Sequence, residues 1–132
     1  MPSFRGLASW EVGSEIIYCE ETELGLLDLH NCCDLLSTAV LGNPDAGIDL
    51  TLTFVTLEAS GRQFQLTFGD VSELELRSVP EVINEDTRDF FGLDYWQRHG
   101  EAGIGNFEVR TGILEVGFRA SMVLLTVNPT RS

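Results

Sequence analysis

Residues 48–77 read IDLTLTFVTLEASGRQFQLTFGDVSELELR, and apolar side chains recur in this stretch at every second position. The apolar positions that share a phase within each run are Ile48, Leu50, Leu52 and Phe54, then Phe64, Leu66 and Phe68, and finally Leu74 and Leu76. A period of two is the period of a β-strand, whose successive side chains point to opposite faces. The stretch therefore predicts three strands, each with one face buried against the core.

The first of these runs changes phase after Phe54, since Val55 and Leu57 are apolar at positions of the other parity. Such a change predicts a β-bulge or a crossing between two layers. The next four residues, 58–61, have the composition of a hairpin loop, and Gly69 and Asp70 separate the second run from the third.

Further strands are predicted on both sides of this stretch. Residues 32–41 are mostly apolar and are followed by a cluster of turn-forming residues at 42–47. Residues 106–110, 113–119 and 122–128 form a meander with short turns between them. We expect one domain over residues 1–132, a mainly β antiparallel sandwich or open barrel of about 7–9 strands with at most one or two short helical turns.

Two segments leave their secondary structure open. Residues 22–29 place leucines three apart, as in a short helix, but Gly25 opposes a helix, so helix and strand remain alternatives. Residues 81–89 mix acids with Val82 and Ile83, a composition that fits a helical turn or a loop.

The charge of the chain is strongly negative and unevenly spread. The 132 residues carry a net charge of −13 and no lysine, and residues 1–61 hold ten acids against Arg5 alone, which gives −9. Phosphate neutralisation needs clustered Lys or Arg, so binding to nucleic acid is not expected. A basic protein partner fits this charge better.

No apolar run approaches the roughly 18 residues that cross a bilayer, and the first residues lack the apolar core of a secretory signal. We therefore expect a cytoplasmic protein that does not enter a membrane. The three cysteines, Cys19, Cys32 and Cys33, are then expected to be reduced.

The chemistry-bearing residues do not form a recognisable catalytic or metal motif. His30 lies close to Cys32 and Cys33, but adjacent cysteines in a strand point to opposite faces and cannot both reach one zinc ion. His30 and His99 lie outside any nucleophile or phosphate-loop motif. We predict a protein without a metal or cofactor that is not an enzyme.

An aromatic segment follows residues 81–89. Phe90, Phe91, Tyr95 and Trp96 fall within seven positions and are flanked by charged residues. Large rigid rings with a charged rim are typical of an interface anchor, so these four residues are candidates for binding a partner. The alternative is that the same rings cap one end of the core, and both descriptions remain open.

Three acids, Glu20, Glu21 and Glu23, extend the candidate partner-binding site. Runs of this kind often form only a solvated sheet edge that discourages aggregation. Against that, the charge of −9 on residues 1–61, to which they belong, can raise the rate of encounter with a basic partner by about 10- to 10³-fold at low salt.

In the central strands, the side chains that alternate with the apolar ones include several that are polar but uncharged. These are Thr51, Thr53, Gln63, Gln65 and Thr67, in a chain that is otherwise rich in charge. The β-propensity of threonine explains part of this pattern. The other explanation is a face that is covered by a second copy in a homodimer.

The order of features over residues 29–76 resembles small bacterial β proteins that include immunity proteins of polymorphic toxin systems. The features are Leu29-His30 before a strand, a Gly-rich turn, residues 50–54 and 64–68, then Gly69, Val71 and residues 74–76. An acid often follows the histidine in such proteins, whereas this chain has Asn31. The resemblance implies an acidic, cytoplasmic, non-enzymatic protein that binds one toxin and blocks it.

These observations favour a non-catalytic intracellular binding protein, of the kind that inhibits a basic toxin or another basic protein. Two alternatives stay open. One is a small-ligand-binding β-barrel or enzyme with a pocket near residues 90–99, and the other is a structural subunit of a homo-oligomer.

Overall fold

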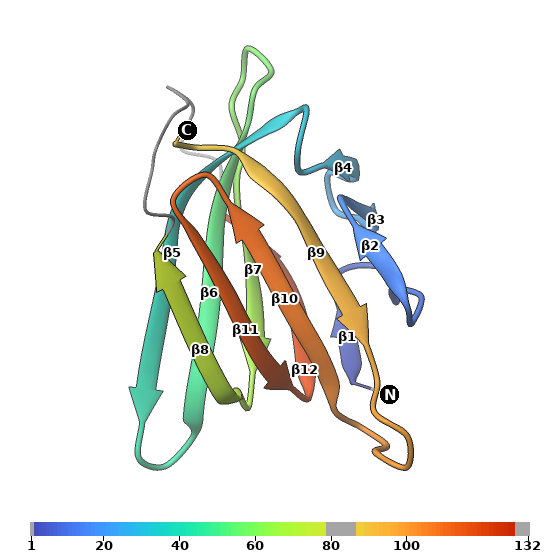
Figure 1. Ribbon diagram of the computed structural model, residues 1–132. Helices are drawn as coiled ribbons and strands as arrows, with labels where there is room; N and C mark the ends of the chain where they lie inside the picture. The colour runs from blue at the N-terminus through green and yellow to red at the C-terminus, as the bar shows by residue number, and fades with distance from the viewer. Residues whose placement is uncertain (1, 79–86, 129–132) are drawn as a thin grey trace.

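The structure is a computed structural model that describes residues 2–78 and 87–128. Two five-stranded sheets pack face to face, and a two-stranded hairpin lies at one side (Figure 1). The first sheet has the order β1 (Ser3–Arg5), β12 (Met122–Val127), β7 (Gln63–Gly69), β6 (Gly47–Thr56), β5 (Cys33–Asn43). The second sheet has the order β2 (Ser14–Ile16), β9 (Phe90–Trp96), β10 (Gly105–Thr111), β11 (Leu114–Ala120), β8 (Ser72–Ser78). The hairpin consists of β3 (Tyr18–Thr22) and β4 (Gly25–Asp28).

The predicted all-β sandwich is confirmed, and the sheets do not close into a barrel. The described residues form twelve strands and no helix, so there are more strands than the expected seven to nine because the N-terminal region adds four short ones. All strand pairs are antiparallel except β1 with β12, which run parallel.

The alternation of residues 48–68 builds the core. Leu52 faces Leu66 across β6 and β7, and these side chains are fully buried. Aromatic rings then join the two sheets, since Phe68 contacts Phe118 of β11 with ring centroids 4.9 Å apart. The predicted burial is therefore confirmed for six residues, whereas Ile48 at the start of β6 is 37% exposed. The six are Leu50, Leu52, Phe54, Phe64, Leu66 and Phe68.

Two expectations about this alternation are wrong. β6 does not change phase after Phe54, because Thr56 continues the buried parity and its hydroxyl accepts a hydrogen bond from the Arg62 N–H at 2.8 Å. The irregular pairing lies instead on β5, between Leu35 and Ser37. The buried face also ends before Leu76, which is 54% exposed because β8 is the edge strand of its sheet.

The structure determines the secondary structure of residues 22–29, one of the two segments that the sequence left undecided. Residues 22–29 form no helix but contain the turn of a hairpin and its second strand, β4. Gly25 turns the chain at φ +81°, and the Thr22 hydroxyl donates to the Gly25 carbonyl oxygen at 2.6 Å. Residues 90–96, which the sequence marked only as aromatic, form strand β9. Residues 79–86 lie outside the described part of the chain, and with them most of the segment 81–89. The described residues contain no helix that is long and apolar enough to span a membrane.

Candidate functional site

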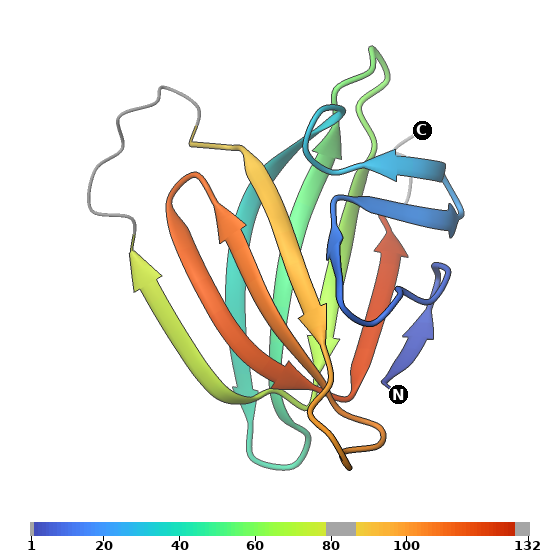
Figure 2. The ribbon, with the colours of Figure 1, turned by 45° about the vertical axis from the view of Figure 1, so that its right-hand side comes forward.

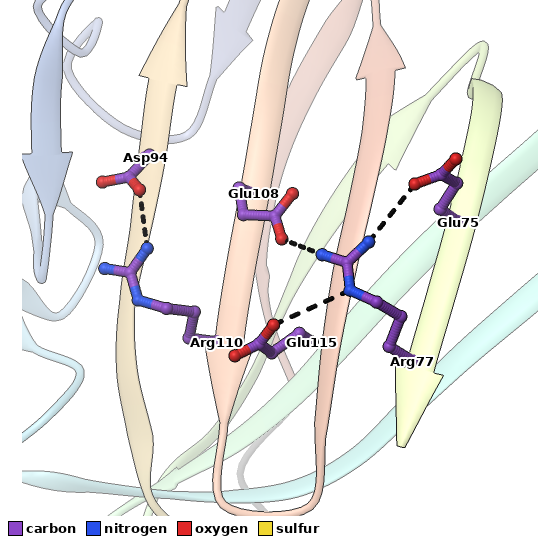
Figure 3. Close-up of polar contacts among 6 residues, drawn as sticks. All are labelled: Glu75, Arg77, Asp94, Glu108, Arg110 and Glu115. Atoms are coloured by element: carbon purple, nitrogen blue, oxygen red, sulfur yellow. Dashed lines mark hydrogen bonds and ion pairs between the residues drawn. The ribbon is translucent and has the colours of Figure 1, made fainter. Parts of the chain in front are cut away.

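The outer face of the second sheet carries a ladder of ion pairs (Figure 3). Arg110 on β10 donates from Nη1 to Asp94 Oδ2 on β9 at 2.6 Å, and its Nη2 lies 3.5 Å from Glu15 Oε1 on β2. Gly92 makes room for this group, since a Cβ there would lie 3.0 Å from Glu15 Oε1 and 3.2 Å from Arg110 Nη2. One arginine therefore links three neighbouring strands.

A second group of the same ladder is centred on Arg77 of β8 (Figure 3). Its guanidinium lies 3.2 Å from Glu75 Oε2 and 3.7 Å from Glu115 Oε2, and it also donates to Glu108. The Glu108 carboxylate lies over Gly117, where a Cβ would come within 2.6 Å of it. Exposed pairs such as these add about 0–1 kcal/mol each to stability, so their main effect is to offset part of the negative charge of this face.

The third group surrounds Trp96 at the end of β9. An open groove of about 510 Å³ runs past Trp96, and Arg98 and Arg119 line it together with Glu73. Arg98 lies 3.4 Å from Glu73 Oε2 and Arg119 lies 3.8 Å from Glu73 Oε1, and Arg119 also pairs with Glu101. The basic residues of this groove are thus paired with acids, and His99 is not among the residues that line it.

The four residues of the aromatic segment separate into two kinds. Phe90 and Tyr95 are enclosed in the core, so their rings offer no surface to a partner. Phe91 and Trp96 are 40% and 41% exposed. They lie at opposite ends of β9, with Phe91 beside the ring of His30 at 6.1 Å and Trp96 in the groove of the second sheet. The segment therefore does not form one aromatic patch.

The largest group of acids without an ion pair lies on residues 11–28, which we call the acidic lobe, whereas Asp45, Asp49, Glu58 and Asp70 lack an ion pair at other places in the described part of the chain. The acids of the lobe without an ion pair to a described residue are Glu11, Glu20, Glu21, Glu23 and Asp28. The lobe contains β2 and the hairpin β3–β4, which lie at the side of the sandwich opposite β8, and the hairpin leads directly into the start of β5 (Figure 2). Glu20, Glu21 and Glu23 are exposed on the hairpin, so the structure brings the three predicted acids together.

The hairpin of the acidic lobe is held to the sandwich by backbone and core contacts. The Ala8 N–H donates to the Glu20 carbonyl oxygen at 2.8 Å, and the buried side chains of Cys19 and Leu27 face inward. At its base, burial raises the pKa of Asp28, but hydrogen bonds from Asn31 and His30 outweigh it and lower that pKa below its usual value. Asp28 therefore stays ionised at neutral pH.

A hollow of about 280 Å³ opens on the acidic lobe. Three carboxylate residues, Glu11, Glu15 and Glu20, line it together with Trp10 and Tyr18. Carboxylates beside an exposed aromatic ring are the groups that bind a guanidinium or an ammonium. The arrangement can receive an arginine or lysine side chain of another molecule.

The sequence marked Glu20 but not the other residues of this hollow. Tyr18 stands next to the acidic run, which was the available signal for it. Glu11 and Glu15 reach the hollow only because β2 pairs with β9, a long-range contact between Glu15 and Asp94 that no local pattern reveals.

The uncharged residues of the central strands lie on the outer face of the first sheet. Thr51 pairs with Thr67 and Thr53 with Gln65, and the hydroxyl oxygens of Thr51 and Thr67 are 3.1 Å apart. Gln63 lies on the same face at the start of β7. The structure thus places the five residues of the predicted oligomer face on one surface.

The histidines and cysteines do not converge. His30 Nδ1 lies 2.8 Å from the Phe90 carbonyl oxygen, whereas His99 is exposed after β9. Burial raises the pKa of Cys19 from its usual value of 9.0 to about 12, and Cys33 adds to this. The described residues contain no group of three or more His, Cys, Asp or Glu that is placed to hold a metal ion.

The three thiols differ in burial, and this difference predicts which of them reacts. Burial, reinforced by nearby Cys32 and Asp28, likewise raises the pKa of Cys33 to about 12, whereas Cys32 is exposed. At pH 8 a thiol with such a pKa is ionised in about one molecule in ten thousand, and the thiolate is the reactive form. Titration with a chromogenic disulfide should give one fast thiol per folded chain and three in denaturant. Three fast thiols in the folded protein would contradict this placement.

No family model matches the chain, and comparison with curated proteins and with solved structures found no match. The surfaces described above are therefore the basis for a function.

Proposed function

We propose that this protein is a non-catalytic binding protein whose acidic lobe receives a basic protein. The observation that carries the proposal is the separation of charge. Each described arginine from Arg77 to Arg119 has a carboxylate partner, most of them on the second sheet. The acidic lobe has five carboxylates without an ion pair to a described residue, and the chain has no lysine or arginine between Arg5 and Arg62.

This separation concentrates the negative field on one side of the molecule. In the ion pairs of the second sheet, four arginines offset four of the seven carboxylates that they contact, so a charge of −3 is left over this whole face. Salt screens charges that lie farther apart than the Debye length, which is about 8 Å at physiological salt. The acids of the lobe do not cancel, so an approaching basic surface is drawn toward the hairpin β3–β4. A complex formed in this way weakens as salt is added.

The lobe also offers the short-range contacts that a stable complex needs. Tyr18 and Leu26 are exposed on the hairpin and supply apolar area beside the acids. The hollow between Glu11 and Glu20 can hold one basic side chain of the partner. Aromatic and apolar anchors within a charged rim are typical of residues that contribute most to binding energy.

The finer proposal is that the partner is a basic toxin, which the protein blocks in the cytoplasm by covering its surface. It is supported by the resemblance of residues 29–76 to toxin-immunity proteins and by the acidity of the lobe. Inhibition by covering a surface requires no catalytic group in the inhibitor.

Binding of an oligo-arginine peptide provides a direct test of the lobe. The lobe variant Glu20→Gln/Glu21→Gln/Glu23→Gln and the control Asp45→Asn/Asp49→Asn/Asp70→Asn both remove three negative charges, from −13 to −10. We expect calorimetry at low salt to show affinity about tenfold weaker for the lobe variant, and within about twofold of wild type for the control.

Equal losses in the two variants would show that only net charge matters, and the lobe would not be the binding site. Trp96→Ala in the same assay tests whether the exposed end of the aromatic segment contributes. For the toxin proposal, the measurement is inhibition of the candidate toxin by the wild-type protein and by the lobe variant. Unchanged inhibition by the lobe variant would remove the lobe from that interface.

A further inference from the structure

The two sheets have four edges, and three of them are protected against pairing with another strand. β1 and β2 have three residues each. β8 carries Glu73, Glu75 and Arg77, and its regular path is broken at Glu73, where φ is +50°. Short length, charge and backbone irregularity are the features by which natural proteins prevent edge-to-edge association.

The fourth edge, β5, has none of these protections along most of its length. β5 has eleven residues, and no charged residue occurs between Asp34 and Asp45. Its irregularity is confined to the start, between Leu35 and Ser37, and regular pairing with β6 continues from Ser37 to Asn43.

Among the described residues, no backbone pairs with the outer edge of β5 over this regular part. The Leu35 N–H donates to the Arg88 carbonyl oxygen at 2.8 Å, so residues 87–88 cover the beginning of the strand. Beyond Leu35, no strand among the described residues pairs with the outer edge. Apolar side chains stay open to solvent there, including Val40 and Leu41, the latter 68% exposed.

We propose that β5 pairs antiparallel with β5 of a second copy of this chain. The two first sheets then join into one continuous sheet of ten strands, five from each copy, around a two-fold axis. Such an interface is self-complementary, because each copy presents the same strand. It satisfies the free backbone groups of residues 37–43 and covers Val40 and Leu41.

The charge distribution favours a second copy over a basic partner at this edge. β5 offers no acid between residues 35 and 44 for a basic partner to recognise. Two copies of this chain, each with a charge of −13, repel each other. Pairing through β5 adds little to this repulsion, because residues 35–44 contain no charged side chain. The acidic lobe adjoins the start of β5, but it lies at the side of the sandwich away from the later part of the strand, where the proposed pairing takes place (Figure 1).

The separation of the lobes can be estimated from strand spacing. Ten strands have nine spacings of about 4.8 Å, so the outermost strands, β1 of each copy, lie about 43 Å apart, several times the Debye length of about 8 Å. The lobe is joined to the segment that follows β1, where the Ala8 N–H donates to the Glu20 carbonyl oxygen. Repulsion between the lobes is therefore screened, and both remain open to the partner of the proposed function.

Sedimentation equilibrium at low and high sodium chloride tests this dimer. We expect the wild-type protein to approach twice its chain mass of 14.6 kDa at high concentration. Added salt should strengthen the dimer, because it screens repulsion between like-charged copies. The complex at the acidic lobe weakens with salt, so the two proposals fail independently. A monomer at all concentrations and salts would overturn the dimer.

Three single substitutions to lysine test where the dimer interface lies. Leu41→Lys sets two like charges at the seam and should give the 14.6-kDa species. Leu76→Lys on the β8 edge and Gln65→Lys on the outer face of the first sheet should leave the dimer intact. Loss of the dimer in Gln65→Lys to the same extent would place the interface on that face and overturn the edge pairing.

Hydrogen exchange gives a second readout that needs no variant. In wild-type protein, part of the amides of residues 37–43 should exchange more slowly at high than at low protein concentration. A dimer whose β5 amides exchange at the same rate at both concentrations would contradict pairing through β5, whatever the fate of Leu41→Lys.

Discussion

Replacing Phe107 with alanine is expected to lower the free energy of unfolding by about 3–5 kcal/mol. The Phe107 ring is fully buried and stacks on Tyr95 with centroids 5.1 Å apart. It also contacts Phe68 of the first sheet at 5.1 Å, Phe118 at 5.4 Å and Trp10 at 6.3 Å. Its removal leaves a cavity where both sheets and the N-terminal segment meet, and these rigid rings cannot collapse to fill it.

Urea denaturation followed by far-ultraviolet circular dichroism measures this change. Phe91→Ala is the matched control, because it removes the same kind of side chain from an exposed position. The Phe91 ring lies beside the ring of His30 and outside the buried aromatic cluster around Phe107. We expect the control to lose less than about 1 kcal/mol. A loss in Phe107→Ala no larger than that of Phe91→Ala would show that the sheets do not pack through this ring.

The second large effect is a loss of stability in alkali. Cys19 and Cys33 have pKa values raised from 9.0 to about 12 in the folded protein. Between these values the unfolded chain releases protons that the folded chain retains, so unfolding becomes more favourable as the pH rises. The stabilisation is complete below pH 9 and is lost toward pH 12. From pH 8 to pH 10 the expected loss is about 2–3 kcal/mol for the two thiols together.

The measurement is the urea midpoint at pH 8, 9 and 10 in the presence of a reductant. Cys19→Ala/Cys33→Ala removes both thiols and should flatten this dependence, even though the variant starts from a lower stability. Burial also raises the pKa of Tyr95 above 10.0, which affects the comparison only at the upper end of the range. A wild-type midpoint that is independent of pH up to 10 would contradict the burial of both thiols.

The sequence predicts the central strands correctly because their burial follows from local alternation. Leu50, Leu52 and Phe54 occupy one parity of a single strand, so only one face can be apolar whatever the rest of the fold. The same argument fails at Thr56, where a buried threonine is satisfied by the Arg62 N–H. A polar residue with a hydrogen-bond partner outside its strand cannot be recognised from the pattern.

The candidate site was harder to predict, because its residues depend on long-range pairing. Phe90 and Tyr95 have opposite parity, yet both point into the core because the pairing of β9 with β10 shifts between Arg110 and Thr111. The composition of the segment therefore did not show which rings are exposed. The predicted acids Glu20, Glu21 and Glu23 lie together because the hairpin that carries them is local.

The parallel pair of β1 and β12 sets the order in which this chain can fold during its synthesis. Ser3 pairs with Met122, and Glu15 of β2 pairs with Asp94, so the earliest strands find their partners only after the late ones have left the ribosome. Contacts between such distant segments are slow to form. The hollow on the acidic lobe needs β2 in place, so a partly synthesised chain lacks it. Partner binding by this lobe therefore requires that synthesis has passed β9.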